Sequence, residues 1–505
     1  MIPAALDPTV STRRLGVVGA GTMGSGIAQL GCTAGIETWL HDPVPQALDK
    51  GQERLRAGIA KGAEKGLWDA GAAENLRTAE SLEELGGCDF LVEAAPERPD
   101  LKRELFGQLS EIAPDAVLAT NTSSILITSL AGAAARPENV VGMHFFNPPP
   151  LMKLVEVIAA EQSSDDAVSR AVELAEAMGR TPIRAYDGPG FLVNRCNRPF
   201  GAESLRLLQE GVATPEQIDR IVRLGGGFRM GPFELMDLVG IDVGFEVARS
   251  FMEQSFGEPR WKPSPLQARM VAAGRLGRKT GRGWYEYPDG RPPDPEPLEP
   301  GGGDGRVVAI EGAGPLAREL RERAARAGYD ARQLVAVGGL EEPELIVDAS
   351  VPAPVTDAGD LPQGPPLIAV CADRSLASRG NPSACGFHAL VPLGDVVELT
   401  RLPTTPDQVA DAADGFFRTL GFQREWVEDA PGLVLGRIVA QLVNEAEFAV
   451  AEGVGSAEDV DLGLKLGMNH PRGPFEWDRE QAHATLDGLW AERREERYRP
   501  APRRQ

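Results

Sequence analysis

A glycine-rich turn near the start of the chain has the residue types and spacing that bind a dinucleotide. The run GAGTMG at 19–24 has the pattern G-x-G-x-x-G, follows the apolar run LGVVGA and opens a stretch with helical spacing. In this context Gly19 permits a tight turn, Gly21 lets the backbone approach a pyrophosphate, and Gly24 lets the helix pack on the strand. The pyrophosphate is expected at the helix N-terminus. The alternative is a glycine turn that holds no ligand.

Asp42 follows 18 residues after the last glycine, at the end of a second apolar stretch. A carboxylate at this place can accept hydrogen bonds from the adenosine ribose hydroxyls, and it repels a 2′-phosphate. The next residues, Pro43 and Val44, offer no arginine to such a phosphate. The sequence therefore predicts NAD rather than NADP as the cofactor.

His144 and Glu156 could perform acid–base chemistry beside that cofactor. His144 lies in HFFNPPP and Glu156 lies in the apolar segment MKLVEV, 12 residues further on. An imidazole titrates near neutral pH, and a carboxylate on one ring nitrogen fixes the tautomer and leaves the other nitrogen as a base. The alternatives are a packed core histidine and a glutamate that only forms a salt bridge. With five histidines in the whole chain, the placement of His144 at a strand end favours catalysis.

Three further sites each allow a functional and a structural interpretation. Residues 121–124, NTSS, end an apolar stretch at the sheet edge where ligands bind, so that Ser123 could contact a substrate or simply cap a helix. Asn194 could reach across a cleft or be an ordinary polar position of a helix. The helical stretch 54–66 carries three cations that could meet a phosphate-bearing ligand tail, although a solvated helix face is the usual explanation: Arg54, Lys61 and Lys65.

These residues require a sheet that carries them on one edge. Short apolar stretches at 15–20, 37–42, 88–97, 116–124 and 140–158 alternate with helical spacing, including a long charged stretch at about 45–75. Strands that alternate with helices indicate a mostly parallel sheet covered on both faces. From Leu192 to about Met252 the pattern becomes helical, which predicts a separate all-helical domain.

The second half of the chain repeats the first in a shortened form. GPGFLVNR at 188–195 reappears as APGLVLGR at 430–437, and both copies carry GPFE downstream. The glycine turn and the His–Glu segment are echoed more weakly. We therefore expect two copies of one unit joined by a Pro- and Gly-rich linker. The predicted domains are a NAD-binding Rossmann domain at 12–187, a helical substrate and dimerisation-type domain at 188–288, a linker at 289–305, a degenerate Rossmann-like domain at 306–429 and a second helical domain at 430–505.

Composition narrows the function classes. The 505 residues carry 52 Lys and Arg against 74 Asp and Glu, a net charge of −22. An acidic chain repels nucleic-acid backbones and anionic membranes. The five scattered cysteines form no metal or disulfide motif, no apolar run is long enough to span a bilayer, and the first residues lack the pattern of a signal peptide. We expect a cytoplasmic protein with no metal.

Six motifs in this order and spacing resemble the L-3-hydroxyacyl-CoA dehydrogenases, including the 3-hydroxybutyryl-CoA branch: GAGTMGSGIA, NTSS, HFFNPPPLMKLVEVI, DGPGFLVNR, GPFELMDLVG and GRKTGRGWYEY. The long plan with a degenerate second copy is similar to the branch of phenylacetate catabolism that oxidises 3-hydroxyadipyl-CoA. The resemblance implies NAD-dependent oxidation of (S)-3-hydroxyacyl-CoA to 3-oxoacyl-CoA, in a β-oxidation-like step of fatty acid metabolism.

The resemblance also implies roles for single residues. His144 is the expected base, Glu156 is its partner, and Ser123 and Asn194 bind the reacting end of the substrate. Coenzyme A is expected near the helix that carries Arg54, Lys61 and Lys65. The residues expected to contact the cofactor are Gly19, Gly21, Thr22, Met23, Gly24, Asp42, Glu97, Lys102, Asn121, Ser123, Asn147 and Lys279.

The second copy differs from the first at positions that correspond to its expected substrate- and cofactor-binding residues. Gly436 stands where the first copy has Asn194, Val391 stands three residues after His388, and no acidic residue ends the apolar run LVAVGG at 334–339. We therefore expect the second copy to be structural and to pair with the first helical domain within one chain, with a homo-oligomer also possible. Two other functions stay open: an NAD-dependent dehydrogenase of a free hydroxy or sugar acid, and a non-catalytic NAD-binding structural or sensor protein.

Overall fold

The computed structural model describes residues 11–333, 343–352 and 364–502 and divides into two compact units. The first unit comprises Met1–Arg195 and Glu452–Met468, and the second comprises Cys196–Ala451 and Asn469–Gln505. The apolar run LVAVGG at 334–339 lies outside the described residues. No described helix is long and apolar enough to cross a membrane.

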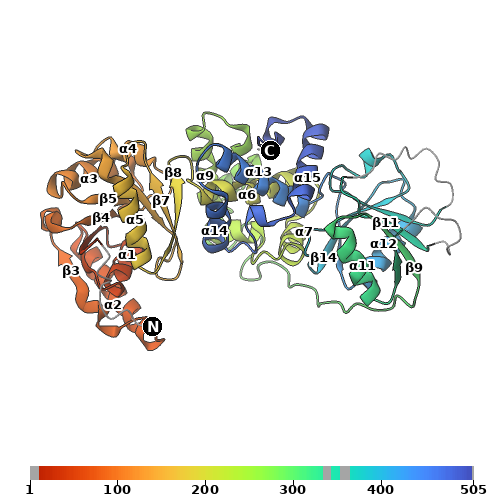
Figure 1. Cartoon of the computed structure of the whole chain (residues 1–505), viewed down its shortest axis with the longest axis horizontal. Helices are drawn as coiled ribbons and strands as arrows, with labels where there is room; N and C mark the ends of the chain where they lie inside the picture. The colour runs from red at the N-terminus through yellow and green to blue at the C-terminus, as the bar shows by residue number, and fades with distance from the viewer. Residues whose placement is uncertain (1–10, 334–342, 353–363, 503–505) are drawn as a thin grey trace. The chain divides into compact units, whose positions relative to one another are not determined.

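The first unit is built on an eight-stranded sheet (Figure 1) with the order β3-β2-β1-β4-β5-β6-β7-β8. Strands β1 to β6 are parallel, β7 runs antiparallel to β6, and β8 is parallel to β7. The strands are β1 (Arg14–Val18), β2 (Glu37–His41), β3 (Leu76–Ala79), β4 (Phe90–Glu93), β5 (Val117–Thr120), β6 (Val140–Phe145), β7 (Leu154–Ala159) and β8 (Thr181–Tyr186).

Helices pack on this sheet because the contact buries their apolar faces away from water. Leu30 of α1, Leu55 of α2 and Leu174 of α5 share one buried core with the strand residues Val17 and Val155. The helices of this unit are α1 (Thr22–Thr33), α2 (Pro45–Glu64), α3 (Pro99–Ile112), α4 (Ile127–Ala131), α5 (Asp165–Ala177) and α14 (Ala457–Met468).

The long helix expected at about 45–75 is shorter than predicted. Helix α2 ends at Glu64, residues 70–75 form a 3-10 turn, and β3 follows at Leu76–Ala79. Glycines at 62 and 66 weaken helical continuation, and Trp68 lies against Gly62, where its indole donates to the backbone oxygen of Ile59. The sequence did not predict β3, because only Leu76 and Ala79 of this four-residue strand are apolar and buried.

The second unit combines helices of both copies with the shortened sheet. Its sheet has seven strands in the order β10-β9-β11-β12-β13-β14-β15, and β14 runs antiparallel to β13 as β7 does to β6. Among the described residues it has no counterpart of β3 or α2, which accounts for the shortening. The strands are β9 (Val307–Glu311), β10 (Asp330–Arg332), β11 (Leu345–Asp348), β12 (Leu367–Val370), β13 (Cys385–His388), β14 (Val396–Arg401) and β15 (Gln423–Trp426).

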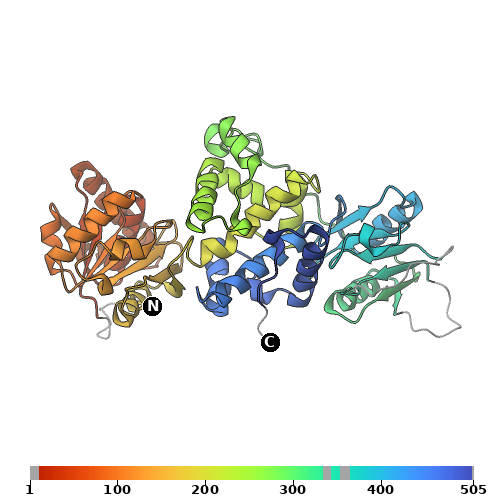
Figure 2. The same cartoon turned by 90° about the horizontal axis from the view of Figure 1, so that it is seen from above.

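One hydrophobic core of this unit takes residues from both copies. Ile218 and Phe233 of the first copy and Ile438 and Val443 of the second are all fully buried in it, and Figure 2 shows the yellow-green and blue helices side by side. The helices are α6 (Val193–Gln209), α7 (Pro215–Arg220), α8 (Pro232–Val239), α9 (Ile241–Gln254), α10 (Pro265–Ala272), α11 (Pro315–Arg326), α12 (Asp407–Thr419), α13 (Leu435–Ala451) and α15 (Arg479–Arg493).

A buried ion cluster ties the same helices together. The Arg437 guanidinium on α13 is fully buried and lies 2.8 Å from a Glu203 oxygen and 2.7 Å from a Glu210 oxygen. Both glutamates belong to the first copy. Because removing one member of a buried ion pair leaves an uncompensated charge, this cluster fixes the pairing of the two copies.

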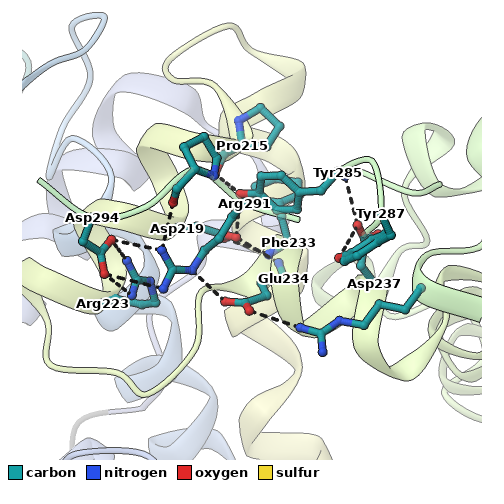
Figure 3. A network of polar contacts seen from close by, with 12 residues as sticks. Pro215, Asp219, Arg223, Phe233, Glu234, Asp237, Tyr285, Tyr287, Arg291 and Asp294 are labelled. Atoms are coloured by element: carbon teal, nitrogen blue, oxygen red, sulfur yellow. Dashed lines mark hydrogen bonds and ion pairs between the residues drawn. The ribbon is translucent and has the colours of Figure 1, made fainter. Parts of the chain in front are cut away.

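The Pro-rich segment after the first helical copy is held along the second unit by side chains. Arg291 Nε donates to Glu234 at 3.1 Å, and Asp294 accepts from Arg223 at 2.8 Å (Figure 3). Further along, the backbone N–H of Gly301 donates to the carbonyl of Thr419 at 2.9 Å. Since this segment forms no helix or strand, these contacts fix its path.

The motif residues GPFELMDLVG and GRGWYEY meet in the same network. Asp237 accepts the backbone N–H groups of Trp284 and Tyr285 at 2.9 and 3.0 Å, and Asp219 accepts the Tyr285 hydroxyl at 2.8 Å (Figure 3). Burial raises the pKa of Asp219 to about 6 and that of Asp237 above its usual range. Through these contacts both carboxylates organise the helical fold.

Candidate active site

The glycine turn between β1 and α1 has the geometry of a pyrophosphate cradle. Gly19 has a φ of +105°, and a Cβ there would lie 2.6 Å from the carbonyl oxygen of Ala94. A Cβ on Gly24 would lie 1.7 Å from the Gly19 oxygen, whereas one on Gly21 would meet no atom within 4 Å. Helix α1 starts at Thr22, is followed by Met23, and has no side chain hydrogen-bonded to its N-terminal N–H groups. The N-terminal N–H groups of α1 and the open space over Gly21 therefore suit a bound diphosphate.

Asp42 is fixed against this turn. Its two carboxylate oxygens accept the backbone N–H groups of Ala20 at 2.9 Å and Val44 at 3.0 Å. The bond to Val44 is local, whereas the bond to Ala20 ties the residue after β2 to the glycine turn. This is the place at which the sequence predicts contact with a ribose.

Arg54 and the two lysines of α2 differ in their surroundings. Arg54 turns toward the glycine turn, where its Nη1 lies 3.0 Å from the Ser25 hydroxyl and 3.3 Å from the Ala20 carbonyl oxygen. Lys61 and Lys65 are exposed. Arg54 therefore supports the turn, and all three cations are exposed and accessible to a ligand.

His144 and Glu156 form a buried hydrogen-bonded pair. They stand opposite each other in the antiparallel register of β6 and β7, and His144 Nδ1 lies 2.7 Å from Glu156 Oε2. The other oxygen, Oε1, accepts the N–H groups of Leu192 at 3.1 Å and Val193 at 2.9 Å. Glu156 is fully buried, so its charge is balanced by these three donors. The arrangement leaves the His144 Nε2 atom for proton transfer.

The residues after β5 organise the neighbouring part of the same sheet edge. Asn121 Oδ1 accepts the N–H of Phe145 at 2.9 Å, next to His144. Glu97 accepts the Thr122 hydroxyl at 2.5 Å and the Ser123 N–H at 3.2 Å. Burial opposes ionisation of Glu97, but these hydrogen bonds and nearby Lys102 outweigh it and lower the pKa of Glu97. The side chain of Ser123 remains exposed.

Lys102 has a buried partner that its sequence motif does not include. Its ammonium is almost fully buried and lies 2.7 Å from Glu93 Oε1 and 3.4 Å from Glu97 Oε2. Glu93 also accepts the Thr120 hydroxyl at 2.7 Å. Glu93 ends the apolar strand β4, and a charged residue at the end of such a strand was the available signal for a buried ion pair.

The remaining predicted residues lie in different places. Asn147 is exposed just after β6, and Asn194 is half-buried in the first turn of α6, directly after Val193. Lys279 belongs to the second unit, where its ammonium lies 2.5 Å from Asp242. Its expected contact with the cofactor stays a prediction. Among the described residues no cluster of His, Cys, Asp or Glu could hold a metal ion.

The second copy retains a closed version of the His–Glu pair. His388 Nδ1 lies 3.5 Å from Glu398, which accepts the N–H groups of Val434 at 2.6 Å and Leu435 at 3.1 Å. His388 has no exposed surface, and the Gln481 amide lies 3.2 Å from its Nε2 atom. No substrate can reach this imidazole.

Gly436 is part of that closure. A Cβ at this position would lie 2.4 Å from His388 Nε2. The second copy therefore has no room for the asparagine that the first copy carries at position 194.

Comparisons with known proteins match both halves of this architecture. Residues 14–188 match the NAD-binding domain of 3-hydroxyacyl-CoA dehydrogenase. Residues 190–287 and 432–504 match the C-terminal domain of the same enzyme family. The chain is 33% identical to the 3-hydroxyadipyl-CoA dehydrogenase of Escherichia coli K12 over 97% of this chain and 96% of that protein. It is 43% identical to a probable 3-hydroxybutyryl-CoA dehydrogenase of Deinococcus radiodurans, covering 54% of this chain and all of that protein. A crystal structure described as 3-hydroxybutyryl-CoA dehydrogenase from E. coli K12 has a TM-score of 0.82 at 32% identity and covers 97% of both chains.

Proposed function

The chain belongs to the 3-hydroxyacyl-CoA dehydrogenase family, and we propose from this premise that it oxidises (S)-3-hydroxyacyl-CoA to 3-oxoacyl-CoA with NAD. The observation that carries the proposal is the His144–Glu156 pair, which lies in the sheet whose first strand leads into the glycine turn. A base held in one tautomer within a cofactor-binding sheet suits the removal of a hydroxyl proton.

The residues around the turn fit NAD. The N-terminus of α1 would hold the pyrophosphate, Asp42 the adenosine ribose, and the segment from Glu97 to Ser123 the nicotinamide side. NAD, when bound, accepts the hydride that leaves C3 of the substrate.

The protein's own part in the reaction is proton transfer and alignment. His144 Nε2 takes the C3 hydroxyl proton, and Glu156 stabilises the imidazolium that results. Ser123 and Asn194 hold the reacting oxygen so that C3 faces the cofactor. In the reverse direction, the same imidazolium returns the proton to the 3-oxo group.

The exposed cations Arg54 and Lys61 on α2, and Lys65 just after it, are the proposed contacts for coenzyme A phosphates, and Arg54 also holds the glycine turn. The overall charge of −22 disfavours a polyanionic ligand, so binding depends on such a local cationic site. The acyl group is proposed to be either a four-carbon chain or the six-carbon chain with a terminal carboxylate, as the names of the relatives suggest.

Features beyond the site support three further parts of the proposal. The shared helical core and the buried Arg437 cluster support intramolecular pairing of the two copies. The closed His388 pair supports one active site per chain. All five cysteines are buried free thiols, which fits a reducing cytoplasm.

The test is kcat/KM for NADH-dependent reduction of acetoacetyl-CoA, of longer 3-oxoacyl-CoA thioesters and of 3-oxoadipyl-CoA. We expect activity with at least one thioester and a loss of about 10²–10⁴-fold in the His144→Gln variant. Equal activity on free 3-hydroxy acids, with no effect of coenzyme A, would contradict the proposal. A near wild-type kcat in His144→Gln would contradict the role of His144 as the catalytic base.

A further inference from the structure

Helix α14 comes from the second copy but packs in the first unit. It contacts β7 and β8, the strands at the edge of the catalytic sheet (Figure 1). Just before the helix, the carbonyl of Val454 accepts the N–H of Tyr186 at 2.7 Å, and Glu452 lies 2.7 Å from the guanidinium of Arg195. The segment 452–468 is thus fastened to the first unit by polar contacts as well as by packing.

Two glycines at the start and middle of this segment lie against the residues that hold Glu156. A Cβ on Gly455 would lie 2.6 Å from a methyl of Leu192, and one on Gly463 would lie 2.7 Å from a methyl of Val193. Leu192 and Val193 are the two residues whose N–H groups donate to Glu156 Oε1. Any side chain at these positions of the segment would push on the side chains of the two residues whose backbone N–H groups hold the carboxylate.

A third glycine, Gly467, lies one helical turn further, beside an aromatic ring that packs on His144. A Cβ on Gly467 would lie 2.8 Å from a methyl of Leu154 and 3.3 Å from the ring of Phe146. The Phe146 ring packs on His144 with 4.7 Å between ring centroids. Because Gly463 and Gly467 are four residues apart, they share one face of α14, and that face supports both members of the catalytic pair.

We propose that α14 is a positioning element of the active site in the other copy. This role rests on the proposed function of His144 and Glu156. Protein interiors are close-packed, so an added side chain at Gly463 or Gly467 displaces its neighbours. A displacement of about 1 Å in a catalytic group can cost on the order of 100-fold in rate. The second copy, which has no open site of its own, therefore shapes the geometry of the first.

The test uses the full-length chain with Gly463→Leu and Gly467→Leu as separate variants. The matched control is Gly415→Leu in α12, because a Cβ on Gly415 meets no atom within 4 Å. We expect kcat for 3-oxoacyl-CoA reduction to fall at least tenfold in both α14 variants, while the Kd for NADH and the activity of the control stay within twofold of wild type.

A second measurement separates positioning from general loss of stability. In Gly463→Ala the Cβ would lie 2.7 Å from a Val193 methyl and 3.0 Å from an Ile183 methyl. Adding Val193→Ala to the same chain removes the closer contact and should recover part of any kcat lost in Gly463→Ala. Amide hydrogen exchange of the peptide around 188–196 should also quicken in Gly463→Leu but not in the control, because the hydrogen bonds to Glu156 weaken.

The outcomes distinguish this inference from the proposed function. Wild-type kcat in folded Gly463→Leu and Gly467→Leu, or an equal loss in Gly415→Leu, would overturn the role of α14 and leave the proposed function intact. A wild-type chain that reduces no 3-oxoacyl-CoA would end the proposed function and this inference together.

Discussion

Replacing Glu156 by glutamine tests the proposed chemistry with the smallest change in shape. The carboxylate accepts from Leu192 and Val193 through Oε1 and from His144 Nδ1 through Oε2. A glutamine can keep its carbonyl oxygen on the two backbone N–H groups, but its amide then donates toward Nδ1. The imidazole must respond by carrying its proton on Nε2, which is the atom that should act as the base.

The size of the effect follows from these contacts. Restoring the active tautomer would set two N–H donors against each other in a buried site, which costs about 1–3 kcal/mol. The imidazolium also loses its buried carboxylate partner during the reaction. Together these terms give about 3–5 kcal/mol, and at about 1.4 kcal/mol for each tenfold change kcat should fall by about 10²–10⁴-fold.

The assay is the loss of NADH absorbance with acetoacetyl-CoA, with NADH affinity measured separately by fluorescence. The chain offers a control in Glu398→Gln, because Glu398 also accepts two backbone N–H groups, one on each oxygen, and also stands opposite a histidine in an antiparallel strand pair. We expect the control to keep wild-type kcat. A Glu156→Gln variant that is folded, binds NADH normally and retains kcat within threefold of wild type would refute the reasoning.

Three further outcomes are expected. Replacing Asp42 by serine together with Pro43→Arg should raise kcat/KM for NADPH relative to NADH, and a wild type that already uses both equally would contradict the ribose assignment. Titration with NADH should saturate at about one equivalent per chain, whereas two would show a functional second copy. Burial disfavours the charge of Glu203, but Arg437 and Arg206 outweigh it and lower its pKa from 4.5 to about 2. The stability that this group contributes is present above pH 4.5 and lost as the pH falls toward 2, so the advantage of wild type over Glu203→Gln in urea unfolding should shrink over that window by about 3 kcal/mol.

Local patterns in the sequence predicted the parts of the site that are set by neighbouring residues. The turn at Gly19 follows from its glycine spacing, because backbone conformation there depends on the absent Cβ. The partnership of His144 with Glu156 was also predictable, since two strands joined by a short connection place them opposite each other. The fold class followed in the same way from alternating strand and helix patterns.

Local sequence patterns could not predict contacts between segments that are distant in the chain. Nothing local to Lys102 shows that Glu93 buries it, and nothing in the DLGLKLGM stretch at 461–468 shows that Gly463 and Gly467 face the catalytic sheet. The closure of His388 by Gln481 likewise joins residues that only the folded chain brings together. These interactions depend on tertiary packing, whose partners a single sequence does not identify.

The placement of α14 in the first unit also sets the order in which the protein can mature. A ribosome adds about 5–20 residues per second, so the segment 452–468 emerges on the order of tens of seconds after the sheet that it covers. Until then β7 and β8 lack their outer cover and the nascent sheet leaves apolar surface open to chaperones. Domain-by-domain maturation during translation is therefore interrupted in this chain, and the first unit is completed only when α14 has been made.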